Sequence, residues 1–137
     1  MRFMVIVKSV GTAGGDCAAG KHESDFVAAM QKYNDELANA GVLLALEGLR
    51  PVADGVQMRA TAGKWKSTDG PFAETKEVVG GYWLWQVSSR DEAIAWLHRC
   101  PIPADGNTAI ELREVLDTDQ FAGKLAPAFA RRTAVPA

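Results

Sequence analysis

The stretch at residues 78–87, VVGGYWLWQV, constrains the fold more than any other part of the chain. Its β-branched and aromatic residues are typical of a strand. Alternate side chains of a strand point to opposite faces, so Tyr82 and Leu84 share one face. Trp83 and Trp85 share the other. Large apolar side chains on both faces predict that both faces of the sheet are covered.

Four further strands are predicted from apolar or alternating runs. These runs lie at residues 2–8, 42–49, 56–61 and 110–115. The turn signal Ala53-Asp54-Gly55 predicts a hairpin that joins the second and third of them. Residues 63–67 are expected either to extend the third strand or to pair with it.

A long amphipathic helix is predicted over residues 24–40. Ser24 is its expected N-cap, and Gly41 is its expected stop. Apolar side chains recur in this segment at the spacing of one helix face: Phe26, Met30, Tyr33 and Leu37.

A second helix is predicted after the aromatic strand. Ser89 and Glu92 have the spacing of a capping box, which marks a helix N-terminus. Pro101 and Pro103 cannot continue a helix and are expected to end it. The predicted order is therefore strand, helix, strand, strand, strand, helix, strand.

This order is typical of an α+β fold of ferredoxin-like type, with two helices on one face of an antiparallel sheet. We expect such a domain over residues 1–116. A tail over residues 117–137, with a helix as one candidate structure, is expected to pack on the domain or on a partner.

Two helices on one face leave the other face of the sheet without a cover. We expect a second copy of the chain to supply it, which gives a homodimer packed sheet to sheet. The alternative is that the C-terminal tail folds back over this face with Phe121, Leu125 and Phe129.

The composition excludes several classes of function. A net charge of −2 provides no global attraction for nucleic acid or acidic membranes. No apolar run approaches the roughly 18 residues of a membrane helix, and the N-terminus is typical of a strand rather than a signal peptide. A cytoplasmic location is therefore expected.

Metal and nucleotide sites are also not expected. Two Cys and two His residues in no paired motif are too few for a zinc site or a disulfide framework. Residues 15–22 match a phosphate-binding loop except that His22 replaces the hydroxyl residue that holds magnesium. We therefore predict no cofactor.

Charged residues on two strands are candidate ligand contacts. Glu111 and Arg113 share one face of the last strand, opposite Ile110 and Leu112, and are expected on the side away from the helices. There they form either an interfacial ion pair or a ligand clamp. Glu47 interrupts the apolar run LLALEGL, and is either a ligand contact or a solvated strand end.

The stretch at residues 68–77, TDGPFAETKE, combines a tight turn with charge. Gly70 and Pro71 are strong turn residues, and Asp69 can accept hydrogen bonds from the turn amides. Glu74 and Lys76 follow within a few residues. The stretch is either a solvated bend or a rigid turn that presents Asp69 to a ligand.

TDGPFAETKE followed by GGYWLWQV closely resembles the signature of the DGPF proteins, grouped in the YCII-related family. The segments AGVLLALEGLRP, EAIAWLHRCP and IELREV also fit, and the resemblance covers roughly residues 1–116. It implies a ferredoxin-like domain that forms a dimeric α/β barrel. It also implies that Asp69 lies by a cleft near the dimer interface.

The resemblance carries an activity over only in part. One branch of the family has a His in the first helix and an Asp before the Pro that ends the second, suggested as a catalytic pair. These positions fall at Met30 and Cys100, so this chain lacks the pair. Similar folds include muconolactone isomerase and chlorohydroquinone-processing proteins, and DGPF proteins often accompany extracytoplasmic-function sigma factors.

Three functions follow as hypotheses. The first is binding or sensing of a small molecule in a dimer cleft lined by residues such as Trp83 and Asp69. The second is an isomerase or hydrolase in which Asp69 is the base, while Lys76 or Arg113 holds developing negative charge. The third is partnership with a sigma factor. The sequence names no substrate.

Overall fold

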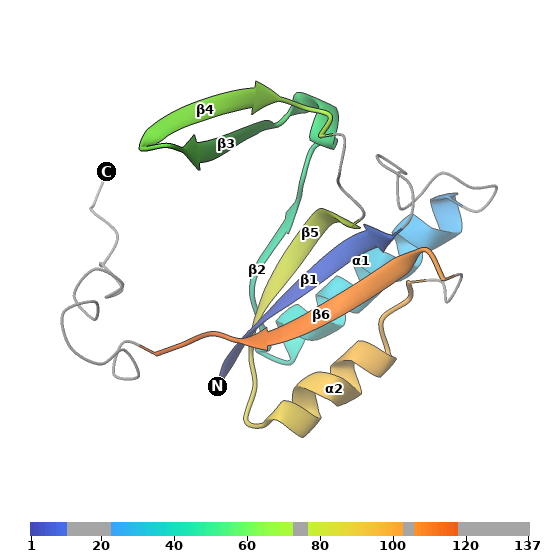
Figure 1. Ribbon diagram of the computed structural model, residues 1–137. Coiled ribbons are helices and arrows are strands. Elements are labelled where there is room, and N and C mark those ends of the chain that lie inside the picture. Colours follow the sequence, from blue (N-terminus) through green and yellow to red (C-terminus); the bar gives the residue numbers. More distant parts are fainter. Residues whose placement is uncertain (11–22, 73–76, 103–105, 118–137) are drawn as a thin grey trace, which may run out of the picture.

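The computed structural model describes residues 1–10, 23–72, 77–102 and 106–117 (Figure 1). Two α-helices and two antiparallel sheets make up this part of the chain. The elements in order are β1 (Arg2–Val10), α1 (Glu23–Asn39), β2 (Leu43–Gly48), the 3-10 turn η1 (Val52–Asp54), β3 (Val56–Thr61), β4 (Lys64–Asp69), β5 (Glu77–Gln86), α2 (Arg90–His98) and β6 (Thr108–Glu114).

The main sheet has four strands in the order β2-β5-β1-β6, and every neighbouring pair is antiparallel. Helices α1 and α2 lie against one of its faces (Figure 1). The predicted α+β class is therefore confirmed. In the described part of the chain, no helix has the length and apolar character needed to cross a membrane.

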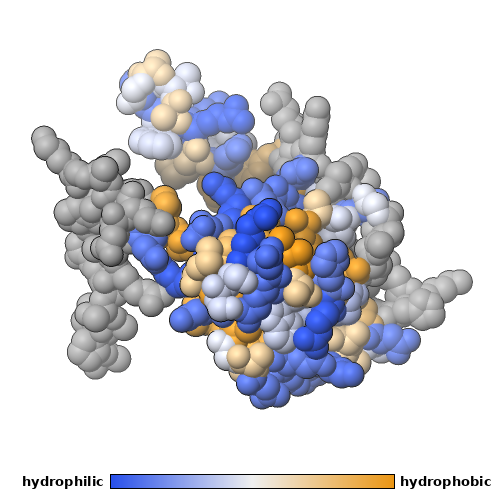
Figure 2. Space-filling model, turned by 90° about the horizontal axis from the view of Figure 1, so that it is seen from below, coloured by the Kyte–Doolittle hydropathy of each residue, from blue (hydrophilic) through white to orange (hydrophobic). Residues whose placement is uncertain are grey.

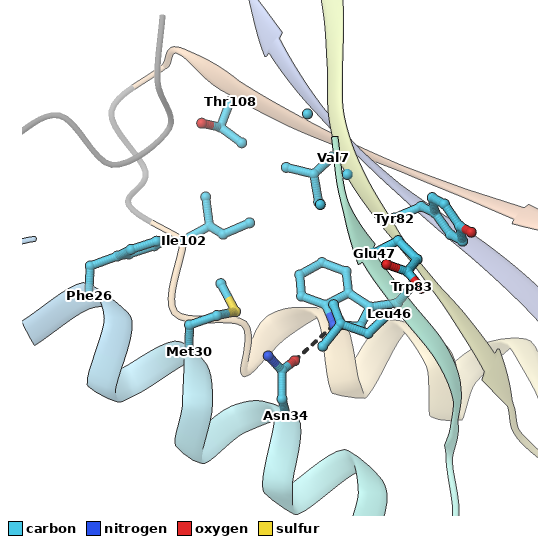
Figure 3. Close-up of a pocket in the computed structure, with 13 residues that line it drawn as sticks. Val7, Phe26, Met30, Asn34, Leu46, Glu47, Tyr82, Trp83, Ile102 and Thr108 are labelled. Carbon is cyan, nitrogen blue, oxygen red and sulfur yellow. Dashed lines mark hydrogen bonds between the residues drawn. The ribbon is translucent and has the colours of Figure 1, made fainter. Parts of the chain in front are cut away.

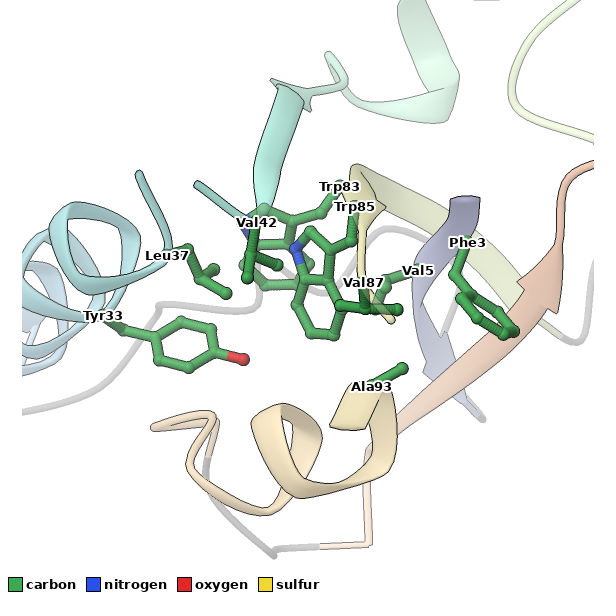
Figure 4. Close-up of a cluster of buried hydrophobic side chains, with 9 residues drawn as sticks. All are labelled: Phe3, Val5, Tyr33, Leu37, Val42, Trp83, Trp85, Val87 and Ala93. Carbon is green, nitrogen blue, oxygen red and sulfur yellow. The ribbon is translucent and has the colours of Figure 1, made fainter. Parts of the chain in front are cut away.

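The core lies between this sheet and the helices (Figure 4). Trp85 is completely buried, and Trp83 contacts the Tyr33 ring edge to face, with 6.1 Å between ring centroids. The Tyr33 hydroxyl donates a hydrogen bond to the Trp96 carbonyl at 2.7 Å, which ties α1 to α2. Trp83 and Trp85 thus share one face, as the alternation predicts, and the structure shows that this face meets the helices.

Helix α1 ends in a Schellman motif. Gly41 has a φ of +74°, and its N–H donates to the Ala38 carbonyl at 3.0 Å. The Val42 N–H donates to the Leu37 carbonyl, also at 3.0 Å, and both of these side chains are in the core. Gly41 is therefore the predicted stop. The predicted N-cap is wrong, because the helix already includes Glu23 and Ser24.

The predicted hairpin through Ala53-Asp54-Gly55 is also wrong. That segment forms η1, and β3 pairs instead with β4, the alternative expected for residues 63–67. The two-residue turn between them explains the choice. Ala62 and Gly63 both have positive φ, at 51° and 77°, which suits the tight turn of a twisted hairpin. The β3–β4 hairpin stands apart from the four-stranded sheet (Figure 1).

The face of the main sheet opposite the helices, called the open face below, carries an apolar centre. The strand register places Met4 beside Leu84 and Ile6 beside Tyr82. All four side chains are only partly buried, although they belong to the two central strands. No described segment covers them.

Helix α2 begins with the predicted cap. Ser89 Oγ accepts a hydrogen bond from the Glu92 N–H at 3.1 Å. Glu92 reaches back one residue further than in a simple capping box, and its Oε2 accepts from the Ser88 N–H at 2.7 Å. Hydrogen bonds from Ser88 lower the pKa of the Glu92 carboxyl group.

Ser89→Ala is expected to lower the free energy of unfolding by about 1 kcal/mol, because it removes the N-cap acceptor. The melting temperature should fall by about 3–5 °C for a chain of this size. Thermal unfolding followed by circular dichroism measures this. Lys66→Ala, on the charged face of the exposed hairpin, is the control and should melt like the wild type. Equal melting of both variants would contradict the capping role.

Candidate functional site

A pocket of about 260 Å³ lies between α1 and the main sheet (Figure 3). Phe26 and Met30 of α1 form one wall, and Trp83 forms the opposite one. Val7, Leu46 and Ile102 complete an apolar lining. An apolar concave site with few polar groups is the usual form of a small-molecule site.

Two glycines create this hollow. On the helix side of the sheet, Gly48, Gly81 and Val7 occupy neighbouring positions on β2, β5 and β1. The next level is filled by Leu46, Trp83 and Val5. A side chain at Gly81 has no space, because its Cβ would lie 2.8 Å from the Glu47 carbonyl oxygen. Gly48 and Gly81 thus leave an empty floor under α1.

Asn34 is a polar residue in the apolar wall. Its Oδ1 accepts a hydrogen bond from Trp83 Nε1 at 2.8 Å (Figure 3). It follows Met30 by one helical turn, as Met30 follows Phe26, so all three lie on one face of α1. Sequence reasoning missed Asn34, although a polar residue on an otherwise apolar helix face was a usable signal.

Two predicted ligand contacts lie at this pocket. Trp83 lines its wall, and Glu47 lies at its edge, beside Tyr82 of the neighbouring strand. Figure 3 shows the Tyr82 ring pointing away from the hollow. At the two positions of the family's suggested His–Asp pair, Met30 and Cys100 both pack against the core, and Met30 also lines the pocket.

Cys100 does not replace the missing acid–base chemistry. Its side chain is half-buried, and burial raises the pKa of the thiol. A thiol with a raised pKa is protonated at neutral pH and is a weak nucleophile. Among the described residues, no cluster of His, Cys, Asp and Glu side chains is suited to a metal ion.

Asp69 lies elsewhere. It is the last residue of β4, is exposed, and pairs with Val56 in the hairpin. The neighbouring Gly70 has a structural role: a Cβ there would lie 1.8 Å from the Val52 carbonyl oxygen, so the turn packs directly on η1. Asp69 is not among the pocket residues. Glu74 and Lys76 lie outside the described residues.

Glu111 and Arg113 lie on the open face, on the opposite side of the sheet from the pocket. Lys8 Nζ lies 2.7 Å from Glu111 Oε2, and Arg113 Nε lies 3.7 Å from Glu111 Oε1. The hydrogen bond from Lys8 lowers the pKa of the Glu111 carboxyl group. These residues form an ion-pair network and are not brought together with Trp83.

Comparison with known proteins gives the chain a family. The model of the YCII-related domain matches residues 1–119. An uncharacterized protein of Rhizobium meliloti (strain 1021) is 39% identical over 70 residues, which are 51% of this chain and 53% of that relative. The match thus spans about half the length of the relative. The family model covers most of the length of this chain, and the chain therefore belongs to the YCII-related domain family.

Proposed function

We propose that this protein binds a small, largely apolar molecule in the pocket between α1 and the main sheet. The observation that carries the proposal is the glycine floor beneath Phe26 and Met30. A side chain at Gly48 of β2 would extend into this space, since its Cβ meets nothing within 4 Å, whereas the Glu47 backbone leaves no space for one at Gly81 of β5. A hollow inside an otherwise packed layer is a site for a ligand.

The size of the pocket limits the ligand. Its 260 Å³ exceeds the cavity of about 150 Å³ that accepts a benzene molecule. It falls just short of the roughly 300 Å³ at which sites for drug-sized molecules begin. A compound with one ring and a short substituent fits these limits.

Binding is favoured over acid–base catalysis. The positions of the family's suggested catalytic pair hold Met30 and Cys100, and neither group exchanges protons readily at neutral pH. The alternative base, Asp69, lies on the hairpin and outside the pocket. A binding or sensing role therefore agrees better with the residues present than an isomerase or hydrolase does.

We also propose a ferredoxin-like domain that forms a homodimer through the open face. The strand order and the helices on one side support the domain type. The partly buried centre of Met4, Ile6, Tyr82 and Leu84 supports the dimer, because a sheet of this kind needs a second layer. A twofold axis would set the same face of each copy together.

The β3–β4 hairpin offers the same second copy a further apolar surface. Its register places Val56, Met58 and Trp65 on one face, and each is at least 58% exposed. Its other face carries Arg59 and Lys66. Figure 2, which views the molecule from below, shows orange hydrophobic residues at the surface between blue hydrophilic ones.

Leu46→Trp tests the pocket. The larger ring should narrow the hollow and weaken binding of a one-ring probe such as acetophenone about tenfold or more, since most of the probe's apolar contact is lost. Leu44→Trp is the matched control. It lies on the same strand with similar exposure, 43% against 40%, but does not line the pocket. Isothermal titration calorimetry measures both. Equal affinities in the two variants would place the binding elsewhere.

Leu84→Glu tests the dimer. A carboxylate at the centre of an apolar interface is left unpaired, so the dissociation constant should rise about 100-fold or more. Light scattering coupled to size exclusion should show twice the chain mass of 14.7 kDa for the wild type and a monomer for the variant. Val27→Glu, on an exposed position of α1, should stay dimeric. A monomeric wild type would refute the proposal.

A further inference from the structure

We propose that Asn34 makes the pocket selective for ligands that carry a neutral hydrogen-bond acceptor, such as the carbonyl of a small aryl ketone, aldehyde or lactone. The inference rests on the proposed binding function and names the chemical class of the ligand. It starts from the one hydrogen bond drawn in the pocket wall, between Trp83 and Asn34 (Figure 3).

The hydrogen bond fixes which way the Asn34 amide points. The indole N–H of Trp83 is a donor only, so it must meet the amide oxygen and not the amide nitrogen. Trp83 is 4% exposed, and water cannot readily replace this acceptor. A flipped amide would set two donors against each other and leave the indole N–H unsatisfied. The orientation is therefore determined by Trp83.

Once Oδ1 is occupied, Nδ2 is the group left for a ligand. It carries two N–H donors and donates to no acceptor in the described part of the chain. Figure 3 shows the amide nitrogen on the side of Met30, facing the hollow. A donor set in an apolar wall favours a ligand whose acceptor meets it, because the donor otherwise loses its partner when the ligand displaces water.

The charges around the pocket favour a neutral acceptor over an anion. Glu47 is the charged residue of the described lining, and the strand register places it beside Tyr82 on the open face. The described lining contains no Lys or Arg side chain that could pair with a carboxylate or phosphate ligand. An anion in the pocket would therefore lose its water without gaining a cationic partner, whereas a carbonyl accepts from Nδ2 without that cost.

A pair of isosteric probes tests this selectivity. Acetophenone and α-methylstyrene share a shape, but the second has a methylene group where the first has its carbonyl oxygen. The wild type should bind acetophenone about fivefold more tightly, the ratio that one neutral hydrogen bond contributes. Calorimetry at pH 8 measures both affinities. Leu46→Trp, the pocket-narrowing variant, should weaken both.

Asn34→Asp is the decisive variant. Its carboxylate still accepts from Trp83 Nε1 and keeps the shape, but it offers no donor when ionised at pH 8. The preference for acetophenone should vanish or reverse. Asn39→Asp makes the same change at an exposed end of α1 and should keep the preference. Should Asn34→Asp unfold, Asn34→Leu also removes the donor and should likewise abolish the preference.

The outcomes separate the two proposals. Equal wild-type affinities for both probes, each weakened by Leu46→Trp, would overturn the role of Asn34 and leave the pocket in place. A preference that survives in both Asn34→Asp and Asn34→Leu would overturn it as well. No binding of either probe to the wild type would overturn both proposals.

Discussion

The rest of this structure depends on the contacts that the Trp83 side chain makes. One side of its ring belongs to the core, where Tyr33 meets it edge to face and Trp85 lies 6.2 Å away between ring centroids. The other side forms the wall of the pocket, and its nitrogen orients Asn34. The same side chain thus stabilises the fold and shapes the site. A substitution of Trp83 would change the fold and the site together, so neighbouring residues such as Leu46 and Asn34 are the better positions for testing the pocket.

The glycines beside Trp83 explain why a hollow persists next to a dense core. Interiors pack closely, and a space of this size would normally be filled by larger side chains on the strands. At Gly81 this route is closed, because the Glu47 backbone approaches too near for a Cβ. Glycine at position 81 therefore lets β2 and β5 approach closely and also leaves the floor of the pocket open. The fold keeps this space although filling it would add apolar contacts, which is expected of a site rather than of a structural core.

Local patterns predicted much of the fold but little of the site. Alternation in the aromatic strand correctly separated Trp83 from Tyr82, and Gly41 correctly marked the end of α1. The pairing of β3 with β4 was left open because residues 63–67 were expected either to extend the third strand or to pair with it. The positive φ values of Ala62 and Gly63 turn the chain back there, so the two segments pair. Asn34 was missed because its role depends on a tryptophan far away in sequence. Asp69 stood out as a motif residue, yet its neighbour Gly70 owes its place to packing on η1.

The two faces of the sheet link the proposed dimer to the proposed pocket. Glu47 pairs with Tyr82 on the open face, while the adjacent Gly48 and Leu46 border the pocket on the other. Strand β2 is an edge strand, held on one side only by β5. An edge strand of this kind is the wall of the pocket with the most freedom to shift. A second copy packed on the open face would restrain β2 through Glu47 and its neighbours, and would thereby fix the width of the pocket from behind.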